Sequence, residues 1–316
     1  MMTTGIIGAT GFIGSYLCHH AGDSQRPLRI LTRSAAKVPS SLTAEILQGD
    51  LLSRADCQRF ACGLETIYYL AHTNTPLNSD LDRPADAALN LAPFLTLLDA
   101  VRQLRGKPHI VYFSSGGAGY APSGAHVPYR ECDPCAPGSS YGILKLAAEH
   151  YLRLAAERGE LTATVLRVGN AYGTLLPQFR TQGLIGVALN QLLHDEPVRL
   201  FGNAGNVRDY VHLHDLRAMT MKASTPRRPF DIVNVGSGQG HSVHDVLAIM
   251  RDCHGSPFPI RMDAARGQWL TDWVVLDSSY AKHEYDWTPA ISLREGIAAM
   301  LEAANAELGA QSAIAP

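Results

Sequence analysis

The stretch "TGIIGATGFIG" (residues 4–14) places three glycines between an apolar strand and a predicted helix. A turn through Gly8, Gly11 and Gly14 has the backbone freedom for a tight bend and for close approach to a pyrophosphate. The helix that follows presents free N–H groups and the positive end of its dipole to such an anion. A tight turn without a ligand is the alternative. The position of the turn, after the first strand and before a helix, favours dinucleotide binding.

Apolar runs alternate with helical patterns through the first half of the chain. The runs are rich in β-branched residues and nearly continuous, which is typical of strands in a parallel sheet that helices cover on both faces. Strands are predicted at residues 4–9, 27–33, 44–50, 65–71, 109–115 and 161–170, and helices at 11–22, 52–63, 86–105 and 139–159. The sequence therefore predicts an α/β fold with a Rossmann-type, doubly wound parallel sheet.

The pattern loosens after residue 171, where we expect a smaller C-terminal substrate-binding domain. Helices are predicted at 184–196, 242–255 and 292–309, short strands at 198–202, 208–216 and 229–238, and an irregular stretch at 259–289. The last helix begins with a capping box made by Ser292 and Glu295. The expected domains are a dinucleotide-binding Rossmann domain of residues 1–170, to which 207–235 return, and a mainly substrate-binding domain of residues 171–206 and 236–316.

The composition excludes several classes of function. The chain has 316 residues, 46% of them hydrophobic, and a formal net charge of −2 with acidic and basic residues mixed along its length. There is no basic stripe and no apolar run near the ~20 residues that span a bilayer, so we expect neither nucleic acid nor a membrane as a partner. No basic leader precedes the first apolar stretch, and six cysteines suit a reduced chain, so we expect a cytoplasmic protein.

The end of the second strand bears on the choice between NAD and NADP. An acidic residue there would hold a free ribose 2′-hydroxyl, but "LTRS" has Thr32 and Arg33 in that place, and Lys37 follows. Arg33 would suit the 2′-phosphate of NADP, and the alternative is that it stacks on adenine or faces water. Asp50 in "GDL" (49–51) is a candidate adenine contact, with a plain turn aspartate as the equal alternative.

The segment "YGILK" (141–145) places Tyr141 and Lys145 four residues apart on a predicted helix, so both side chains share a face. A phenol with a pKa of ~10 is a poor base at neutral pH. An ammonium within ~4–6 Å favours the phenolate and lowers that pKa, and the positive charge of a cofactor would help further. Tyr141 would then take a proton from a sugar hydroxyl while hydride passes to nicotinamide, and Lys145 would also hold the nicotinamide ribose.

Together these motifs resemble the extended short-chain dehydrogenase/reductase superfamily, and within it the NAD-dependent epimerase/dehydratase family, which includes UDP-glucose 4-epimerase. The resemblance covers nearly the whole chain. It runs through "GATGFIG" (8–14), "NTPLNSDLDRPADAALN" (74–90), "FSSGGAGY" (113–120), "SSYGILKLAAEHYL" (139–152), "LRVGNAYG" (166–173), "LFGNAGNVRDYVHLHDL" (200–216) and "VLDSSYAKHEYDWTPAISLREGI" (275–297).

In this family a serine or threonine normally joins the tyrosine and lysine, three residues after the aromatic residue that ends the fifth strand. Counting from Phe113, that place is Gly116, so the usual hydroxyl is missing. Ser115 is the nearest candidate to bind the substrate oxygen, and the alternative is a water or the sugar's own hydroxyl that bridges to Tyr141. The catalytic residues that the resemblance implies are Tyr141, Lys145 and Ser115.

The resemblance also implies a set of binding residues. Asn170 would contact the substrate diphosphate or sugar, and Arg208 the nucleotide diphosphate. A guanidinium suits phosphate because it offers a fork of donors. Arg266 is a second candidate for the diphosphate, and Leu184 and Phe201 are candidates for the nucleotide base. A surface ion pair is the alternative for each arginine. Cofactor contacts are expected at Gly8, Gly11, Phe12, Ile13, Gly14, Arg33, Asp50, Leu51, Ala71, Tyr141, Lys145 and Val168.

Two pairs of residues have the spacing of metal ligands. His212 and His214 would share one face of a predicted strand, but no third ligand is apparent. Cys132 and Cys135 form a C-x-x-C in an expected loop, and no second pair completes a zinc site. We therefore expect no metal.

The implied function is an NAD(P)-dependent nucleotide-sugar epimerase, acting at C4 of a UDP-sugar through a keto intermediate, with NAD as the expected cofactor. The main alternative is an NADPH-dependent nucleotide-sugar ketoreductase, which Arg33 favours, and the lesser one is a catalytically silent cofactor-binding protein. A dehydratase would need an Asp–Glu pair where the loop has Gly117 and Ala118. The helices at 86–105 and 139–159 resemble those that pair in family dimers, so we expect a homodimer.

Overall fold

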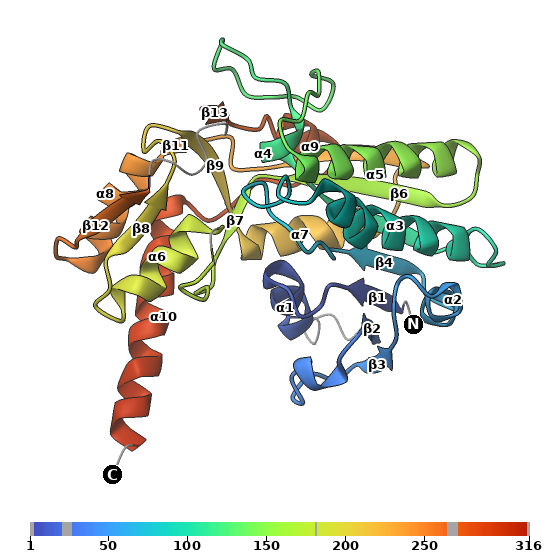
Figure 1. The fold of residues 1–316 in the computed structure, drawn as a ribbon, viewed down its shortest axis with the longest axis horizontal. Coiled ribbons are helices and arrows are strands. Elements are labelled where there is room, and N and C mark those ends of the chain that lie inside the picture. Colours follow the sequence, from blue (N-terminus) through green and yellow to red (C-terminus); the bar gives the residue numbers. More distant parts are fainter. Residues whose placement is uncertain (1–2, 21–26, 181, 264–270, 315–316) are drawn as a thin grey trace. The chain divides into compact units, whose positions relative to one another are not determined.

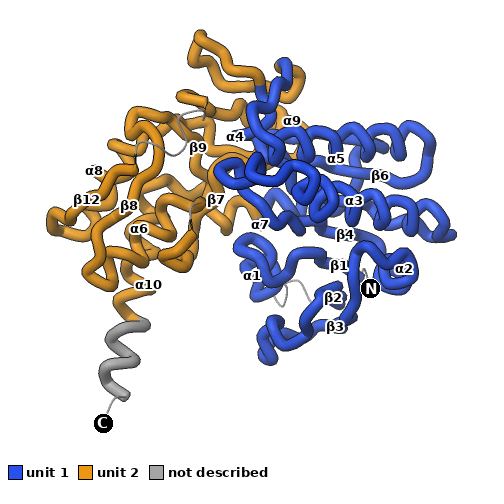
Figure 2. The backbone as a smooth tube through the Cα atoms, in the orientation of Figure 1, with its two compact units in different colours: residues 1–120, 134–167, 217–234 blue, residues 121–133, 168–216, 235–316 orange. Residues whose placement is uncertain are grey.

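The computed structural model describes residues 3–20, 27–180, 182–263 and 271–314, with side chains described as far as residue 306. The chain forms two compact units (Figure 2). The first unit comprises residues 1–120, 134–167 and 217–234, and the second comprises residues 121–133, 168–216 and 235–316. Of the segment 207–235, which we expect to return to the first unit, residues 217–234 belong to that unit. Residues 207–216 belong to the second unit, where β9 (Val207–His212) pairs with other strands.

The first unit is built on a seven-stranded sheet with the order β10-β6-β5-β4-β1-β2-β3 (Figure 1). Its strands are β1 (Thr4–Ile7), β2 (Leu28–Thr32), β3 (Glu45–Gln48), β4 (Thr66–Tyr69), β5 (His109–Ser115), β6 (Thr162–Val168) and β10 (Phe230–Val235). β1 is parallel to β2 and β4, β2 is parallel to β3, and β4 is parallel to β5. The strand order reverses at β1, so the predicted Rossmann-type sheet is confirmed.

Helices lie on both faces of this sheet. On one face α2 (Arg54–Ala61), α3 (Arg83–Val101) and α5 (Ser140–Glu157) share a hydrophobic core with Tyr69 and Tyr112. Successive strand residues point to opposite faces, and the hydroxyl of Tyr68 accordingly lies 2.5 Å from the hydroxyl of Ser224, just after α7 (Leu213–Ala223). The remaining helix, α1 (Phe12–His19), follows β1 directly.

The second unit combines short strands with three longer helices. β9 lies between β11 (Gly240–Ser242) and β13 (Trp273–Val274) and also pairs with β7 (Asn170–Tyr172), while β8 (Val198–Phe201) pairs with β12 (Ile260–Asp263). A second core gathers apolar side chains from the helices α6 (Leu184–Leu192), α8 (Val243–His254) and α10 (Leu293–Ile314). Ser292 and Glu295 cap α10 as predicted, with the Ser292 hydroxyl 2.6 Å from the carboxylate.

Three stretches differ from the sequence prediction. The strand predicted over 208–216 is wrong in its second half, because α7 begins at Leu213. The stretch 259–289, predicted to be irregular, contains β12, β13 and the helix α9 (Ser279–Tyr285). These strands are short and pair with distant segments, so their local pattern is weak. The loop after β5 begins with a four-residue helix, α4 (Gly116–Gly119). No described helix is long and apolar enough to cross a membrane.

Candidate active site

The first strand ends in the glycine turn that the sequence singles out. Gly8 has a φ of +91°, and a Cβ there would lie 2.7 Å from the backbone nitrogen of Ala71, so only glycine fits. A Cβ on Gly14 would collide with the carbonyl oxygen of Gly8. The amide of Gly11 donates to that same carbonyl over 3.0 Å and closes the turn. The start of α1 is therefore held against the end of β1 by backbone contacts.

The N-terminus of α1 has no capping side chain within the part of the chain that the structure describes. Gly11 is the N-cap residue and makes no side-chain hydrogen bond, and the first turn contains no acidic residue. Free amides and the positive end of a helix dipole suit an anion at this place. Phe12 and Ile13 begin the helix and are half-buried. These features fit the pyrophosphate of a dinucleotide.

The other candidate cofactor residues of the first half lie at or beyond strand ends. Arg33 follows β2 and is exposed, as is Lys37, and neither makes an ion pair within the described residues. Asp50 accepts a hydrogen bond from the amide of Leu52 over 2.9 Å, the bond expected of a turn aspartate. Its contact with adenine stays a prediction. The other candidate cofactor contacts are Leu51, Ala71 and Val168.

Helix α5 carries Tyr141 in its first turn. Ser139 caps the helix and accepts a hydrogen bond from the amide of Gly142 over 3.2 Å. A Cβ on Gly142 would collide with the carbonyl oxygen of Ala118, so glycine lets α5 pack directly against the segment after β5. Tyr141 and Lys145 both lie on α5, one turn apart, as their spacing predicts.

Lys145 is buried beneath this turn, with 5% of its surface exposed. Its Nζ donates to the carbonyl oxygen of Phe113 over 2.8 Å. The same atom lies 5.0 Å from the ring centre of Tyr112 and 5.7 Å from that of Tyr141. Burial lowers the pKa of Lys145 to about 7, although Glu149, one turn further along α5, acts in the opposite direction. The lysine therefore titrates near neutral pH.

The acidity of Tyr141 differs from the prediction. The expected lowering of its pKa by Lys145 is wrong for this structure, because burial raises the pKa of Tyr141 to about 12. The opposing influence is a hydrogen bond with the side chain of Ser115, which lowers the pKa. The lysine's ammonium is instead engaged with the carbonyl of Phe113 and lies over the faces of two aromatic rings.

The two serines at the end of β5 contact different parts of α5. Ser115 bonds with Tyr141. Ser114 donates to a carboxylate oxygen of Glu149 over 2.5 Å. Glu149 is also paired with Arg167 at 2.7 Å, and each of these two side chains is only 5% exposed. We call Ser114, Glu149 and Arg167 the Glu149 network.

Gly116 occupies the place where the family normally has a hydroxyl. It is buried at the start of α4, and Ser115 is the residue that precedes the helix. The hydroxyl next to it in the sequence, that of Ser115, is the one that contacts Tyr141. The catalytic role of Ser115 stays a prediction.

His72, which the sequence analysis does not single out, lies beside Tyr141. Their ring centres are 4.7 Å apart and their planes meet at 78°, an edge-to-face contact. The Nε2 atom of His72 is buried and has no hydrogen-bond partner within the described residues. Burial lowers the pKa of His72 to about 2, and Lys145 acts in the same direction, so the imidazole is neutral at ordinary pH. We call Tyr141, Lys145, Ser115 and His72 the Tyr141 cluster.

A buried carboxylate on α3 joins three segments of the first unit. Asp86 is fully buried and accepts hydrogen bonds from the hydroxyl of Ser140 over 2.6 Å and from the amide of Asn74 over 2.8 Å. Asn90, one turn later, donates to Asp86 over 2.7 Å and accepts from the backbone amide of Thr73 over 2.7 Å.

Asp86 and Asn90 together hold the residues next to two members of the Tyr141 cluster. Thr73 follows His72, and Ser140 precedes Tyr141. Both neighbours bond to side chains of α3, so the loop after β4 and the first turn of α5 share one support. The signal in the sequence is a pair of polar residues four apart on an otherwise apolar helix, "DAALN" (86–90).

The second unit holds two of the predicted substrate residues on adjacent strands. Arg208 lies half-buried on β9, donates to the carbonyl of Val207 over 2.8 Å, and makes no ion pair within the described residues. Burial lowers the pKa of Arg208, whereas Tyr210 and Asp272 raise it. Asn170 is exposed on β7, where it pairs with Tyr210 in the ladder and bonds with its side chain. A guanidinium held in this way remains charged.

The residue next to Arg208 has a purely structural set of contacts. The Asp209 carboxylate accepts from the amide and the hydroxyl of Ser237, each over 2.6 Å. It also accepts from the amides of Gly238 and Leu276, each over 3.1 Å. Burial raises the pKa of Asp209, and these bonds lower it. Asp209 thus ties β9 to two loops of its own unit.

The positions of the other predicted substrate residues say little about a ligand. Leu184 begins α6 and packs against the core of the second unit, and Phe201 ends β8 and is half-buried. Arg266 lies outside the described residues. Their contacts with a nucleotide base or diphosphate stay predictions.

The histidine pair does not have the geometry that chelation from a strand would need. His212 ends β9, whereas His214 lies on α7 and its backbone amide donates to Nδ1 of His212 over 3.1 Å. Within the residues that the structure describes, no group of three or more His, Cys, Asp or Glu side chains is arranged to hold a metal ion.

The chain matches a known protein family and resembles known proteins over most of its length. The profile of the NAD dependent epimerase/dehydratase family matches residues 5–236. A UDP-glucose 4-epimerase of Mycolicibacterium smegmatis is 28% identical over 95% of this chain and 98% of that protein. A dTDP-6-deoxy-L-talose 4-dehydrogenase (NAD(P)(+)) of Kitasatospora kifunensis is 28% identical over 92% of each. The crystal structure of a Thermus thermophilus UDP-glucose 4-epimerase in complex with NAD has a TM-score of 0.83 and 26% identity, covering 95% of this chain and 98% of that one.

Proposed function

Because this chain belongs to the NAD-dependent epimerase/dehydratase family, we propose that it is a nucleotide-sugar epimerase that uses NAD and acts at C4 of a UDP-linked sugar. The observation that carries the proposal is the position of the Tyr141 hydroxyl. It lies at the carboxyl end of the sheet's central strands, bonded to Ser115 and one helical turn from Lys145.

The residues of the first unit fit the dinucleotide. The glycine turn and the uncapped start of α1 would hold the pyrophosphate, and Lys145 would hold the nicotinamide ribose. The chemistry that NAD supplies when bound is the reversible acceptance of hydride from a sugar carbon. Tyr141 would have its phenol oxygen at the reacting hydroxyl.

Tyr141 carries the proton through the cycle. It accepts the proton of the sugar's 4-hydroxyl as the carbon is oxidised, and returns it to the oxygen after the keto sugar has turned over. The buried phenol, with a pKa of about 12, must become more acidic for this step. The hydrogen bond with Ser115 acts in that direction, and so does positive charge near the ring.

Arg208 and Asn170 are our candidates for the diphosphate and sugar in the second unit. The guanidinium of Arg208 is half-buried and free of ion pairs within the described residues, so its charge is not already neutralised by an acid there. Asn170 presents an exposed amide on the adjacent strand. A fixed, forked cation beside an amide suits a sugar diphosphate.

The proposal is tested by incubating the purified protein with a panel of UDP-sugars in deuterated water and following C4 by NMR. We expect UDP-glucose or a related UDP-sugar to approach equilibrium with its 4-epimer, and the hydrogen at C4 to be retained because it leaves and returns as hydride. Tyr141→Phe should still bind NAD and convert the sugar far more slowly than wild type. Deuterium at C4, or an unchanged panel, would contradict the proposal.

An NADPH-dependent nucleotide-sugar ketoreductase is the second candidate function. The exposed pair Arg33 and Lys37, without an ion pair in the described residues, is what favours it, because cations at the end of β2 suit a 2′-phosphate. Such an enzyme would consume NADPH in proportion to a keto sugar nucleotide. An ultraviolet spectrum showing tightly held NAD after purification supports the epimerase, whereas readily exchanged NADPH supports the reductase.

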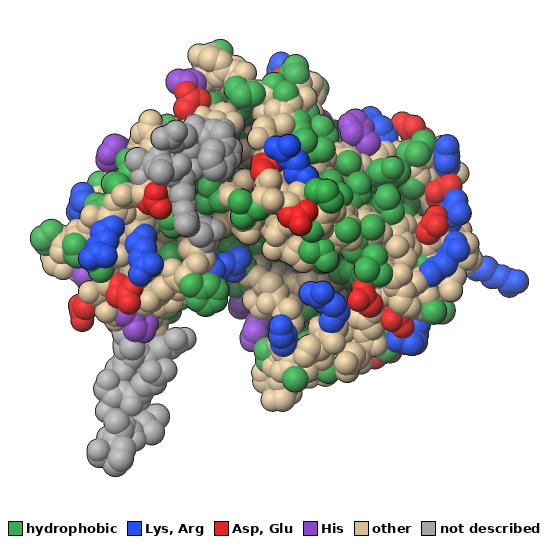
Figure 3. Space-filling model, viewed as in Figure 1, with side chains coloured by type: hydrophobic (Ala, Val, Ile, Leu, Met, Phe, Trp, Pro, Cys, Tyr) green, Lys and Arg blue, Asp and Glu red, His purple; other side chains and the backbone are tan. Residues whose placement is uncertain are grey.

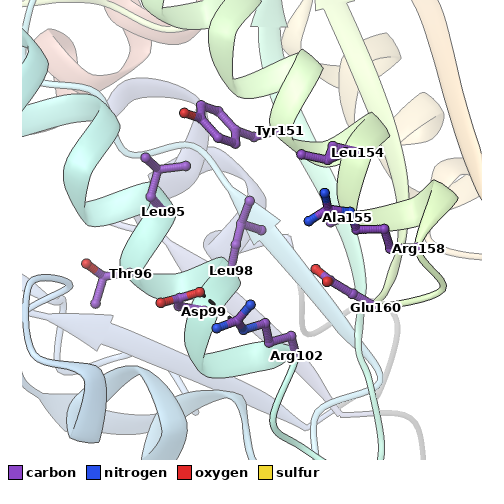
Figure 4. Close-up of a pocket in the computed structure, with 10 residues that line it drawn as sticks. All are labelled: Leu95, Thr96, Leu98, Asp99, Arg102, Tyr151, Leu154, Ala155, Arg158 and Glu160. Carbon is purple, nitrogen blue, oxygen red and sulfur yellow. Dashed lines mark ion pairs between the residues drawn. The ribbon is translucent and has the colours of Figure 1, made fainter.

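We also propose that the protein is a homodimer that pairs through α3 and α5. Hydrophobic side chains gather over these two helices (Figure 3), and Leu89, Ile143 and Tyr151 are 49%, 54% and 42% exposed. A pocket between the helices is lined by Leu95 and Leu98 from α3 and by Tyr151 and Leu154 from α5 (Figure 4). Exposed apolar patches of this kind are typical of protein interfaces.

Light scattering tests the dimer, with Leu154→Glu as the variant that should separate it. Wild type at micromolar concentration should have twice the mass of the chain, and the variant should have the mass of one chain. A monomeric wild type would contradict the dimer.

All six cysteines are free thiols, which suits the cytoplasmic location that we also propose.

A further inference from the structure

One buried polar atom in the Tyr141 cluster has no partner within the described residues, namely Nε2 of His72. Burial without a hydrogen bond is unfavourable for such an atom, and the great majority of buried polar atoms in native proteins are paired. An unpaired one beside a candidate catalytic phenol therefore points to a ligand that pairs with it.

Three segments bring this atom to the phenol. His72 follows β4, Ser115 ends β5, and Tyr141 lies in the first turn of α5. The His72 ring meets the Tyr141 ring edge to face, with ring centres 4.7 Å apart, while Ser115 bonds to the phenol oxygen. The backbone on both sides is fixed to α3, through the bonds from Thr73 to Asn90 and from Ser140 to Asp86.

The chain lacks the hydroxyl that the family normally places at Gly116. A neutral imidazole is a suitable replacement because it has one N–H donor and one acceptor nitrogen. The reacting oxygen alternates between a hydroxyl and a ketone, and a ketone oxygen only accepts hydrogen bonds. A donor therefore serves both forms of the substrate, which selects the tautomer with the proton on Nε2.

We propose that His72 donates a hydrogen bond from Nε2 to the reacting oxygen of the sugar, and so replaces the hydroxyl that is missing at Gly116. The proposal rests on the proposed function, since it takes a sugar substrate as given. His72 binds and orients this oxygen but does not carry its proton, because burial, with Lys145 acting in the same direction, keeps the imidazole neutral.

A hydroxyl could reach Nε2 from either of two sources, the sugar or the nicotinamide ribose. Both would satisfy the same atom by the same chemistry. We assign the sugar, because the atom lies in the group that holds the Tyr141 hydroxyl. The experiment separates the two sources by measuring the sugar and the dinucleotide independently.

Two variants separate the contribution of the His72 N–H donor from that of its ring. His72→Phe keeps a ring against Tyr141 and removes the donor, whereas His72→Gln removes the ring and keeps an amide donor near the place of Nε2. With NAD saturating, we expect kcat/KM for the sugar nucleotide to fall about 10- to 100-fold in His72→Phe, and most of it to return in His72→Gln. The Kd of NAD, measured by fluorescence, should change less than about twofold in both.

Several kinetic results would overturn the proposal. Equal kcat/KM in wild type and His72→Phe would show that the donor is not used. A loss in His72→Gln as large as that in His72→Phe would show that only ring packing matters. A loss of NAD affinity in His72→Phe, with unchanged kcat/KM at saturating NAD, would assign the hydrogen bond to the ribose.

A spectroscopic measurement decides the proposal without turnover. The ¹⁵N signal of the His72 Nε2 is assigned as the one absent from His72→Gln, and should have the shift of a protonated nitrogen. It should move when UDP-glucose is added to protein with NAD, but not when UDP is added. No movement with the sugar nucleotide, or an equal movement with NAD alone, would contradict the proposal. If wild type converted no sugar nucleotide, the proposed function would fail, and this signal would still decide the role of His72.

Discussion

Ser114 and Ser115, the two serines that end β5, are adjacent in the chain, but their side chains have different hydrogen-bond partners. Ser114 belongs to the Glu149 network, where a buried carboxylate is matched by a hydroxyl and by the guanidinium of Arg167. Ser115 belongs to the Tyr141 cluster, where a phenol and an amine have strongly shifted pKa values and one imidazole nitrogen is unpaired within the described residues. Complete pairing stabilises a fold, whereas incomplete pairing leaves groups available for a ligand and is typical of functional sites.

Both surroundings are served by one face of one helix. Tyr141, Lys145 and Glu149 follow each other at intervals of four residues on α5, so their side chains lie in a row. Lys145 stands between the two groups: it donates to the Phe113 carbonyl and responds to the charge of Glu149. Changes at either end of this row should therefore have different consequences, on turnover at one end and on stability at the other.

The largest expected effect tests the incompletely paired end. Tyr141→Phe removes one hydroxyl and keeps the ring against His72, so we expect turnover to fall about 10²- to 10⁴-fold. The melting temperature should stay close to that of wild type, because the apolar packing is retained. Turnover is measured by NMR and melting by circular dichroism. A variant that keeps wild-type turnover would remove Tyr141 from the chemistry.

The next effect tests the fully paired end. Glu149→Ala leaves the buried Arg167 without its counter-charge, so the free energy of unfolding should fall by about 3–5 kcal/mol. The control is Asp252→Ala, which removes an exposed ion pair with Arg294 of the same 2.7 Å length. That change should cost much less, because an exposed ion pair is well solvated and contributes little to stability. Denaturant unfolding of both variants measures the difference, and equal losses would refute the argument from burial.

The lysine between the two groups predicts a dependence of stability on pH. The unfolded chain holds this proton up to the ordinary pKa of 10.5, whereas the folded protein releases it at about 7. Between these values the unfolded state binds more protons, so this lysine makes the free energy of unfolding rise as the pH rises from about 7 to 9.

Lys145→Met removes that contribution, and comparison with wild type isolates it from other titrating groups. Below pH 7 the two proteins should differ by a constant amount. From pH 7 to pH 9 wild type should gain stability relative to the variant, as measured by urea unfolding at each pH. Parallel stability curves across this window would show that the lysine keeps its proton in the folded protein.

The smallest effects are expected from substitutions of Ser114 and Ser115, and they test the difference between the two serines directly. Ser114→Ala should lower the free energy of unfolding by about 1–2 kcal/mol, because it removes one donor to a buried carboxylate, and should leave turnover near wild type. Ser115→Ala should lower turnover about tenfold with little change in stability. If the two variants changed stability and turnover in the same way, the separate roles assigned to the two hydroxyls would be wrong.

The sequence predicts the first unit well and the second unit less well, for a physical reason. β5 is a continuous apolar run, and its predicted bounds, 109–115, agree with the structure. Strands such as β12 and β13 are only four and two residues long, and they form because they pair with segments far away in the chain. A local pattern cannot show such a pairing. The sequence does not predict the start of α7, because Val211 and Leu213 continue the strand-like alternation of β9 into its first turn.

The site shows the same limit. Tyr141 and Lys145 could be predicted because their spacing on a helix determines that they share a face. His72 could not, since its importance depends on a contact between segments that are distant in sequence. For Asp86 the sequence offers only the polar pair in "DAALN" (86–90), which does not show what the carboxylate binds. The direction of the Tyr141 pKa was predicted wrongly, because desolvation depends on how deeply the folded chain covers the phenol and is invisible in a four-residue spacing.

The carboxylate of Asp86 has a consequence for inherited variation in this chain. This one carboxylate on α3 accepts hydrogen bonds from the segment after β4 and from the first turn of α5. A substitution there would shift both without touching the glycine turn, so the protein would still load its dinucleotide while losing the alignment needed for turnover. Such a mutation would present in a genetic screen as an active-site lesion, although the altered residue never meets the sugar.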